Sequence, residues 1–394
     1  MIPDYRRTRF ACYIGYIVQA IVTNFAPLLF VHFSDKYGIP LTKITLLITI
    51  NFGIQLFVDL VSTVLIDRIG FRTSFYLAHG FSAAGLIMLT FMPDIMPDPF
   101  VGILIPIVIY AIGGGLIEVV ISPIIEACPA ENKEKQMSML HSFYCWGQVG
   151  VVLVSTVFFT LFGIGSWRIL SVSFAAIAVA NMILFGNSPI GTLNGEGEKG
   201  MSLKELFSVR IFFVFLIMML CAGASEQAIS QWASSFAERG LGVNKAVGDL
   251  AGPMAFAFLM GMSRLIYGKL GHRLDMNRFM MVSTALCIVS YGCIVFVPNP
   301  VVGLVGCAVS GFAVGIMWPG TYSMAVARLP RGGSAMFALL ALAGDIGCTS
   351  GPTLAGFVSG ASGDDLRAGI LAAMIFPVMM SVCLFFVRKK KKAY

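Results

Sequence analysis

Glu118 lies inside a long apolar segment, 100–127, past its midpoint. Its neighbours at helical spacing are Gly114, Gly115 and Ser122. A charged group inside a bilayer costs roughly 2.5–3.5 kcal/mol on insertion scales, so its presence needs a reason. A carboxylate in a low-dielectric surrounding holds a proton more readily than one in water. We therefore expect Glu118 to bind and release a proton, as a proton-coupling group must. The alternative is a hydrogen-bonded acid that only stabilises the helix bundle.

Glu226 lies near the middle of a second apolar segment, 210–237, at the start of a polar face that also contains Gln227, Ser230 and Gln231. Residues three and four apart are neighbours on a helix, and a lipid-facing helix would not carry four polar side chains on one face. This face therefore lines water or protein. Its donors and acceptors suit the hydroxyl groups of a sugar, so we expect a role in substrate binding and proton coupling.

Aromatic and acidic residues in other apolar segments extend this expected site. Tryptophan usually lies at the membrane interface, but Trp146 and Trp318 fall near mid-depth. They are expected to stack on a flat ligand such as a sugar ring, with core packing as the alternative. Trp232, nearer a segment end, fits an interfacial residue. Asp345, in the middle of segment 335–359, joins the predicted substrate-binding set.

Two further charged residues, Asp59 and Arg264, lie inside the apolar segments 44–66 and 247–268. They are separated by the same 205 positions as Asp67 and His272, which suggests two related halves. We expect gate or interface roles for both. Because Arg264 lies about one turn from a segment end, the alternative is that its long side chain reaches the interface.

These residues require a scaffold that holds them in lipid. The 394 residues are 57% hydrophobic and only 12% charged, whereas soluble domains carry roughly 25% charged residues. A span needs about 20 apolar residues, and it must be helical because lipid cannot satisfy backbone polar groups. The sequence predicts an all-α integral membrane protein with twelve spans: 11–33, 44–66, 75–95, 100–127, 138–162, 168–186, 210–237, 247–268, 279–297, 301–327, 335–359 and 367–387.

The longest polar loop, 187–209, divides the chain into six-helix halves, 1–186 and 210–394. Repeated halves place a central site between them. With a cytoplasmic N-terminus, most of the 27 Lys and Arg residues fall in inner loops and in the basic tail, as cytoplasmic loops require. We therefore expect a multi-pass plasma-membrane protein with both termini cytoplasmic. The outer exceptions are Lys36, Lys43, Arg168, Arg239, Lys245 and Arg367.

Other functional classes find little support. The sequence has no HExxH, no GxSxG and no ligand cluster, so a membrane-embedded enzyme has no visible catalytic residues and no metal site. A GxGxxG match at 195–200 has no preceding strand and is read as linker. The net charge of +7 follows membrane topology, which argues against nucleic acid as a partner. A channel would not need two related halves.

Residues 65–72 resemble the signature G-x-L-a-D-R-x-G-R-R that major facilitator transporters carry between their second and third helices. The matching residues are Asp67, Arg68, Gly70 and Arg72. A weaker second copy at 268–275 keeps Gly268, Leu270 and Arg273. The resemblance implies two six-helix pseudo-repeats and a gate that pairs basic residues with acids and helix ends. The gating set is Asp59, Asp67, Arg68, Gly70, Arg72, Arg264 and Arg273.

A narrower resemblance is to the fucose permease-like branch of sugar:proton symporters. It rests on a glycine-rich segment ending in Glu118, on Ser122-Pro123, on His141-Ser142-Phe143 and on Thr23-Asn24-Phe25. The branch's acidic residue in helix one falls on Pro27 here. The resemblance implies a sugar site, for which the substrate-binding set is Asn24, His141, Trp146, Gln148, Gln227, Gln231, Trp318, Tyr322 and Asp345.

The sequence thus predicts a secondary transporter of a small hydrophilic, sugar-like solute that acts as a monomer. It needs no cofactor beyond an ion gradient, with protons preferred and sodium as the alternative. An exporter of drugs or metabolites on the same fold is the nearest rival, but the polar faces favour a hydrophilic substrate. Glycines in the later segments, including Gly347 and Gly351, fit helices that pack closely.

The topology is tested by cysteine or tag reporters. Reporters at Lys133, Lys199 and Tyr394 should be cytoplasmic, and those at Lys36 and Arg239 external, because the basic loops are predicted to stay inside. Impermeant-reagent labelling of intact cells measures this. An external Tyr394 would refute the even number of spans.

Overall fold

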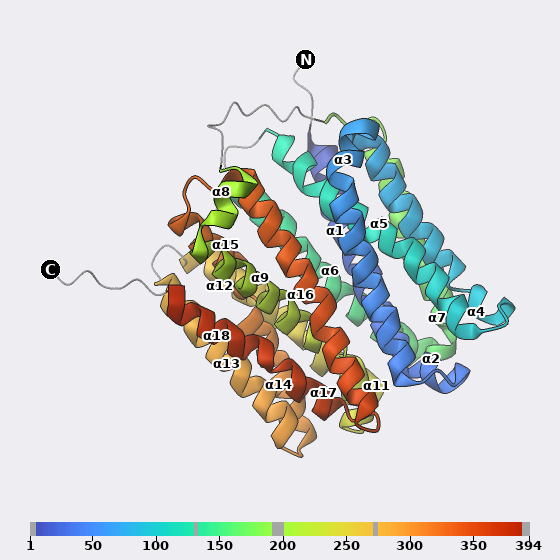
Figure 1. Cartoon of the computed structure of the whole chain (residues 1–394). Coiled ribbons are helices and arrows are strands. Elements are labelled where there is room, and N and C mark those ends of the chain that lie inside the picture. Colours follow the sequence, from blue (N-terminus) through green and yellow to red (C-terminus); the bar gives the residue numbers. More distant parts are fainter. Residues whose placement is uncertain (1–4, 130–132, 191–200, 271–274, 388–394) are drawn as a thin grey trace. The chain divides into compact units, whose positions relative to one another are not determined.

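A computed structural model describes residues 5–129, 133–190, 201–270 and 275–387 (Figure 1). These residues form helices joined by short turns, with no strand among them, so the predicted all-α fold is confirmed. Eleven helical stretches in the described part of the chain are long and apolar enough to cross a membrane. They are Arg6–Tyr37, Leu41–Ser62, Pro99–Ala127, Met139–Phe162, Ile164–Phe185, Arg210–Gly240, Lys245–Tyr267, Met276–Phe296, Pro300–Arg328, Met336–Ala361 and Leu366–Val387.

The third predicted span, 75–95, covers the end of helix α3, Leu41–Met88, and the short helix α4, Met92–Ile95. Gly70 interrupts this helix with φ +79° and ψ 155°, a conformation that glycine adopts without steric cost. The part that follows is helical to Met88 but places Ser74, His79 and Ser82 at fully buried positions. The predicted span therefore continues beyond the end of α3.

By backbone proximity the chain separates into two compact units, Met1–Gly195 with Val243–Met254, and Glu196–Gly242 with Ala255–Tyr394. The division predicted at 186 and 210 stays a prediction. The first unit contains α1 Arg6–Asn24, η1 Ala26–Leu29, α2 Phe30–Tyr37, α3, α4 Met92–Ile95, α5 Pro99–Ala127, α6 Lys133–Phe162, η2 Ile164–Ser166, α7 Trp167–Phe185, α11 Lys245–Asp249 and η4 Leu250–Met254.

In the first unit, α3 packs along α5, and α1 lies against α5, α6 and α7. The α3–α5 contact is close because small residues face one another. A Cβ atom on Gly113 would lie 2.4 Å from Ser82 Oγ and 2.6 Å from the Ala78 carbonyl oxygen. The first predicted span is interrupted after Asn24, where α1 ends. The short helix η1 follows, and its first turn contains Pro27, which has no N–H to donate.

The second unit contains α8 Leu203–Ser208, α9 Arg210–Ser230, α10 Ala233–Ser235, η3 Phe236–Gly240, α12 Ala255–Leu270, α13 Met276–Phe296, α14 Pro300–Val314, α15 Met317–Arg328, α16 Gly333–Ala361, α17 Leu366–Ala373 and α18 Ile375–Val387. Helices α9 and α16 run side by side (Figure 1). A Cβ atom on Gly347 would lie 2.0 Å from the Leu220 carbonyl oxygen, and one on Gly351 would lie 2.3 Å from that of Ala224. The close packing expected of these glycines is confirmed.

The α9–α16 contact can be tested with one methyl group. Gly347→Ala should destabilise the protein by about 1–3 kcal/mol, the usual cost of overpacking, because the backbone of Leu220 must move. Thermal unfolding in detergent measures this.

Gly292→Ala in α13 is the matched control, since a Cβ atom there meets nothing within 4 Å and alanine is the better helix former. Equal melting temperatures for the two variants would contradict the close approach of α9 and α16.

Candidate substrate and coupling sites

In the second unit, α9 places Glu226 at mid-span and α12 places Arg264 beside it. Arg264 Nη2 lies 3.4 Å from Glu226 Oε2, and their side chains are 21% and 9% exposed. Arg264 Nε also donates to the Gly315 carbonyl oxygen at 3.4 Å. The guanidinium therefore points toward a mid-span acid rather than toward the interface. The two charges compensate one another within the bundle.

The polar face predicted on α9 is buried in protein. Gln227 Nε2 donates to Glu226 Oε1 at 3.3 Å, and Gln231 Nε2 donates to Gln227 Oε1 at 3.1 Å. As whole residues, all three are at most 7% exposed. The two amides thus continue the polar chain that begins at Arg264, and Gln227 holds one oxygen of Glu226.

Trp232, at the end of α9, was expected at the interface, and this expectation is wrong. The residue is fully buried, and its indole N–H donates to the Pro352 carbonyl oxygen of α16 at 3.0 Å. This hydrogen bond connects the chain just after the C-terminal end of α9 to α16. Depth along a segment could not show which side of the helix the ring faces.

Three predicted binding residues lie on α15 and α16. A Cβ atom on Gly344 would lie 2.2 Å from the Trp318 ring, so one part of this ring packs on helix backbone. Tyr322 stacks on Phe337 with ring centroids 5.2 Å apart and donates its hydroxyl to the Phe337 carbonyl oxygen. Asp345 follows Gly344 and is half-buried. Stacking of Trp318 on a ligand stays a prediction.

In the first unit, Glu118 of α5 and Asp59 of α3 come together, each half-buried, with carboxylate oxygens within 4.8 Å of one another. The sequence had placed Asp59 in the gate and Glu118 in the coupling site. The position of α5 along α3 depends on Gly115. A Cβ atom added there would lie 2.9 Å from Val58 and 3.0 Å from the Gln55 carbonyl oxygen. Two carboxylates this close repel one another when both are charged.

A buried amide pair next to these acids was missed at the sequence level. Gln19 Nε2 of α1 donates to Gln55 Oε1 of α3 at 3.1 Å, and both residues are at most 5% exposed. Gln19 Oε1 lies 3.1 Å from the position of a Cβ on Gly114, one turn before Glu118. The available signal was Gln55, which precedes Asp59 by one helical turn.

The remaining predicted residues of the first unit contact their neighbours on α1, α5 and α6. Tyr16 bonds the Ser122 hydroxyl at 3.0 Å and meets the ring of the exposed His141 edge-on, with centroids 5.3 Å apart. Buried Asn24 donates to the Ala20 carbonyl oxygen at 3.0 Å and to the Tyr144 hydroxyl at 3.4 Å. Gln148 is buried and Trp146 is half-buried on α6.

The predicted gating residues are only partly within the described structure. Arg72 donates to the Gly186 and Ser188 carbonyl oxygens, the latter at 2.7 Å, and so binds the C-terminal end of α7. Cations are favoured there because the helix carbonyls carry partial negative charge. Arg68 is exposed. The side chain of Asp67, and Arg273 as a whole, lie outside the described residues.

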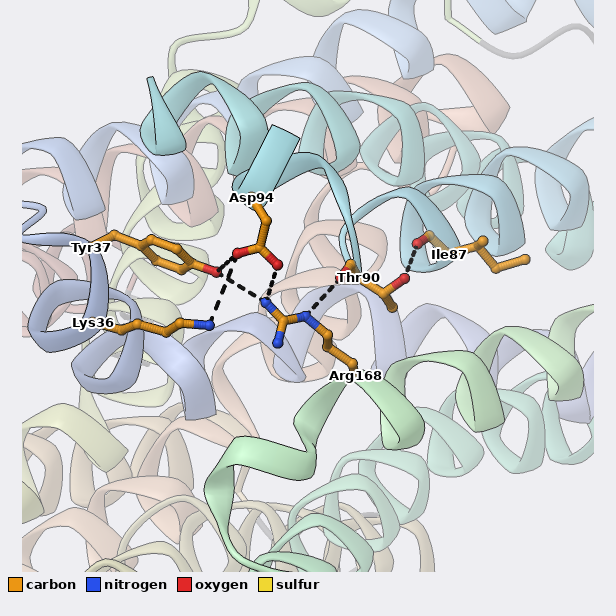
Figure 2. A network of polar contacts seen from close by, with 6 residues as sticks. All are labelled: Lys36, Tyr37, Ile87, Thr90, Asp94 and Arg168. Atoms are coloured by element: carbon orange, nitrogen blue, oxygen red, sulfur yellow. Dashed lines mark hydrogen bonds and ion pairs between the residues drawn. The ribbon is translucent and has the colours of Figure 1, made fainter. Parts of the chain in front are cut away.

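A second polar network connects the ends of α2, α3, α4 and α7 (Figure 2). Arg168 Nη2 lies 2.5 Å from Asp94 Oδ2, and Arg168 Nε donates to the Thr90 carbonyl oxygen at 2.7 Å. Tyr37 donates its hydroxyl to Asp94 Oδ1 at 2.9 Å, with Lys36 Nζ 4.0 Å from the same atom. The sequence placed Lys36 and Arg168 only in outer loops. Both residues share Asp94 as their acidic partner, so they connect these helix ends.

Comparison with known proteins agrees with this architecture. The sequence profile of the Major Facilitator Superfamily matches residues 12–336, and a search of curated proteins finds no match. Among solved structures, a bacterial homologue of the human lysosomal transporter Spinster has a TM-score of 0.77 at 14% identity, covering 98% of this chain and 97% of its own.

Two sugar symporters share the fold. The D-xylose–proton symporter has a TM-score of 0.76 at 13% identity, with 97% of each chain covered. The E. coli fucose:proton symporter has a TM-score of 0.65 at 15% identity, covering 98% of this chain and 100% of its own. The profile match covers most of the chain, and the chain therefore belongs to the Major Facilitator Superfamily, as a multi-pass membrane transporter and not an enzyme.

Proposed function

We propose that this transporter moves a small, hydrophilic, sugar-like solute by proton-coupled alternating access. The observation that carries the proposal is the buried polar chain of Arg264, Glu226, Gln227 and Gln231, joined by contacts of 3.1–3.4 Å at mid-span. Burying four such side chains is costly unless they are paired. Amide and charged groups at this depth suit a ligand rich in hydroxyl groups, and a lipophilic drug would not use them.

Proton coupling is proposed for Glu118, Glu226 or both. Glu118 lies beside Asp59, so binding of a proton to one acid relieves repulsion between the two. Glu226 lies beside Arg264, so a proton on Glu226 neutralises this acid and leaves the positive charge of Arg264 without its partner. Both changes alter the interactions between helices. Where this alteration differs in free energy between two conformations, proton binding shifts the equilibrium between them.

The remaining parts of the proposal follow the topology and the family. The protein is placed in the plasma membrane with both termini cytoplasmic, it works as a monomer, and it uses the proton gradient, with sodium as the alternative ion. The shared fold with a xylose–proton and a fucose:proton symporter supports a sugar-like solute. Arg68 and Arg72 are proposed to stabilise the closed inner gate, Arg72 through the helix end that it already binds.

Glu118→Gln separates coupling from binding. The variant mimics a permanently protonated acid, so it should lose pH-driven accumulation and keep counterflow, because exchange needs no net proton movement. One proton crossing 100 mV is worth about 2.3 kcal/mol, enough for roughly fifty-fold accumulation by the wild type. Paired uptake and counterflow assays in proteoliposomes, over a panel of radiolabelled sugars and nucleosides, measure both.

Asp364→Asn is the control, an acid-to-amide change in an exposed turn at φ +63°, a backbone conformation that asparagine tolerates. It should leave both assays unchanged. Undiminished pH-driven accumulation by Glu118→Gln would remove Glu118 from the coupling mechanism.

A further inference from the structure

The Arg264–Glu226 pair is loose by the standards of charged hydrogen bonds. Arg264 Nη2 lies 3.4 Å from Glu226 Oε2, whereas such bonds are usually about 2.7–2.9 Å and often bidentate. The same chain makes a tight pair at the end of the first unit, where Arg168 and Asp94 approach to 2.5 Å. Glu226 cannot close on Arg264 freely, because Gln227 holds its other oxygen.

The charge of Arg264 always needs an anion. An arginine side chain stays protonated in proteins, and an unpaired cation inside a span is expensive. In this structure Glu226 provides the compensating charge from α9. Another carboxylate in the same place would provide it equally well, and a mobile one could match both nitrogens of the guanidinium fork.

We propose that the substrate is an acid whose carboxylate takes the place of Glu226 on Arg264. Its hydroxyl groups would then meet the amides of Gln227 and Gln231, which continue from the pair along α9. The displaced Glu226 must then hold a proton, so that one substrate carboxylate balances the single charge of Arg264. A phosphate dianion would leave an excess negative charge in the bundle. The substrate class is therefore a small hydroxylated carboxylic acid, such as a sugar acid.

This inference rests on the proposed transport of a hydrophilic solute, and it names the kind of solute. It makes Glu226 a competitor of the substrate for Arg264. Removing the competitor should strengthen binding of the acid, and removing the cation should abolish the preference for it. A purely structural ion pair predicts the opposite for Glu226, since either substitution would then only loosen the fold.

The experiment compares matched pairs of ligands on the purified, full-length transporter by isothermal titration calorimetry. Galacturonate is paired with galactose, and gluconate with glucose. The wild type should bind one acid at least about tenfold more tightly than its neutral partner, the scale of a hydrogen-bonded charge pair. Glu226→Gln should tighten binding of that acid, and Arg264→Gln should remove the preference.

Two variants guard against misfolding and general charge effects. Arg264→Lys keeps the charge but not the fork, so it should weaken acid binding by about tenfold and the binding of neutral sugars by less. Arg278→Gln removes a positive charge whose side chain is 83% exposed and should change nothing. Melting temperatures establish that each variant is folded.

The results separate this inference from the proposed function. Equal binding of neutral sugars and acids, binding of neither acid, or an Arg264→Lys variant that keeps the full preference for acids, overturns the inference. Proton-driven uptake of a neutral sugar would then leave the proposed function standing. Conversely, the expected binding pattern without pH-driven accumulation would support the acid substrate and refute proton coupling.

Discussion

A charge held inside a bilayer must be accompanied by its counter-charge, because lipid offers no solvation in exchange for water. Glu226 and Arg264 meet this condition from two helices of one unit, at 3.4 Å. Neither helix could keep its charged residue at this depth alone at the cost of roughly 2.5–3.5 kcal/mol that insertion scales assign. The pair therefore makes the positions of α9 and α12 depend on one another. Any proton or ligand that alters either charge acts on both helices.

Close helix packing makes such pairs possible. Glycines at the α9–α16 and α3–α5 contacts let backbones approach until a single methyl group would collide with a carbonyl oxygen, as at Gly347 and Gly113. In membranes, where hydrophobicity does not drive helices together, small residues provide this packing. The side chains that remain between the helices can then be polar and still be excluded from lipid. The Gln19–Gln55 pair and the Asp59–Glu118 pair lie beside such a contact.

The sequence predicted the all-α membrane fold, because hydropathy and charge placement report depth in the membrane directly, while the roles of the site residues stay predictions. Glu118 and Glu226 were found in this way. Depth gives no information about direction around a helix axis, so the sequence could not predict which neighbours these side chains meet. Trp232 faces α16 and not the interface, and Asp59 meets Glu118 because Gly115 sets the α3–α5 register. The long side chain of Arg264 could extend toward the membrane interface or toward the middle of the span. Its contact with Glu226 shows that it extends toward the middle.

The dependence of Glu226 and Arg264 on one another is tested most directly by a double-mutant cycle on thermal stability, with Glu226→Gln, Arg264→Gln and the double variant. Removing one partner leaves an uncompensated charge, whereas removing both leaves two amides that can hydrogen-bond. The account predicts that the double variant melts above at least one single variant, with a coupling energy on the order of 0.5–3 kcal/mol. Losses in the double variant that equal the sum of the two single losses would contradict it.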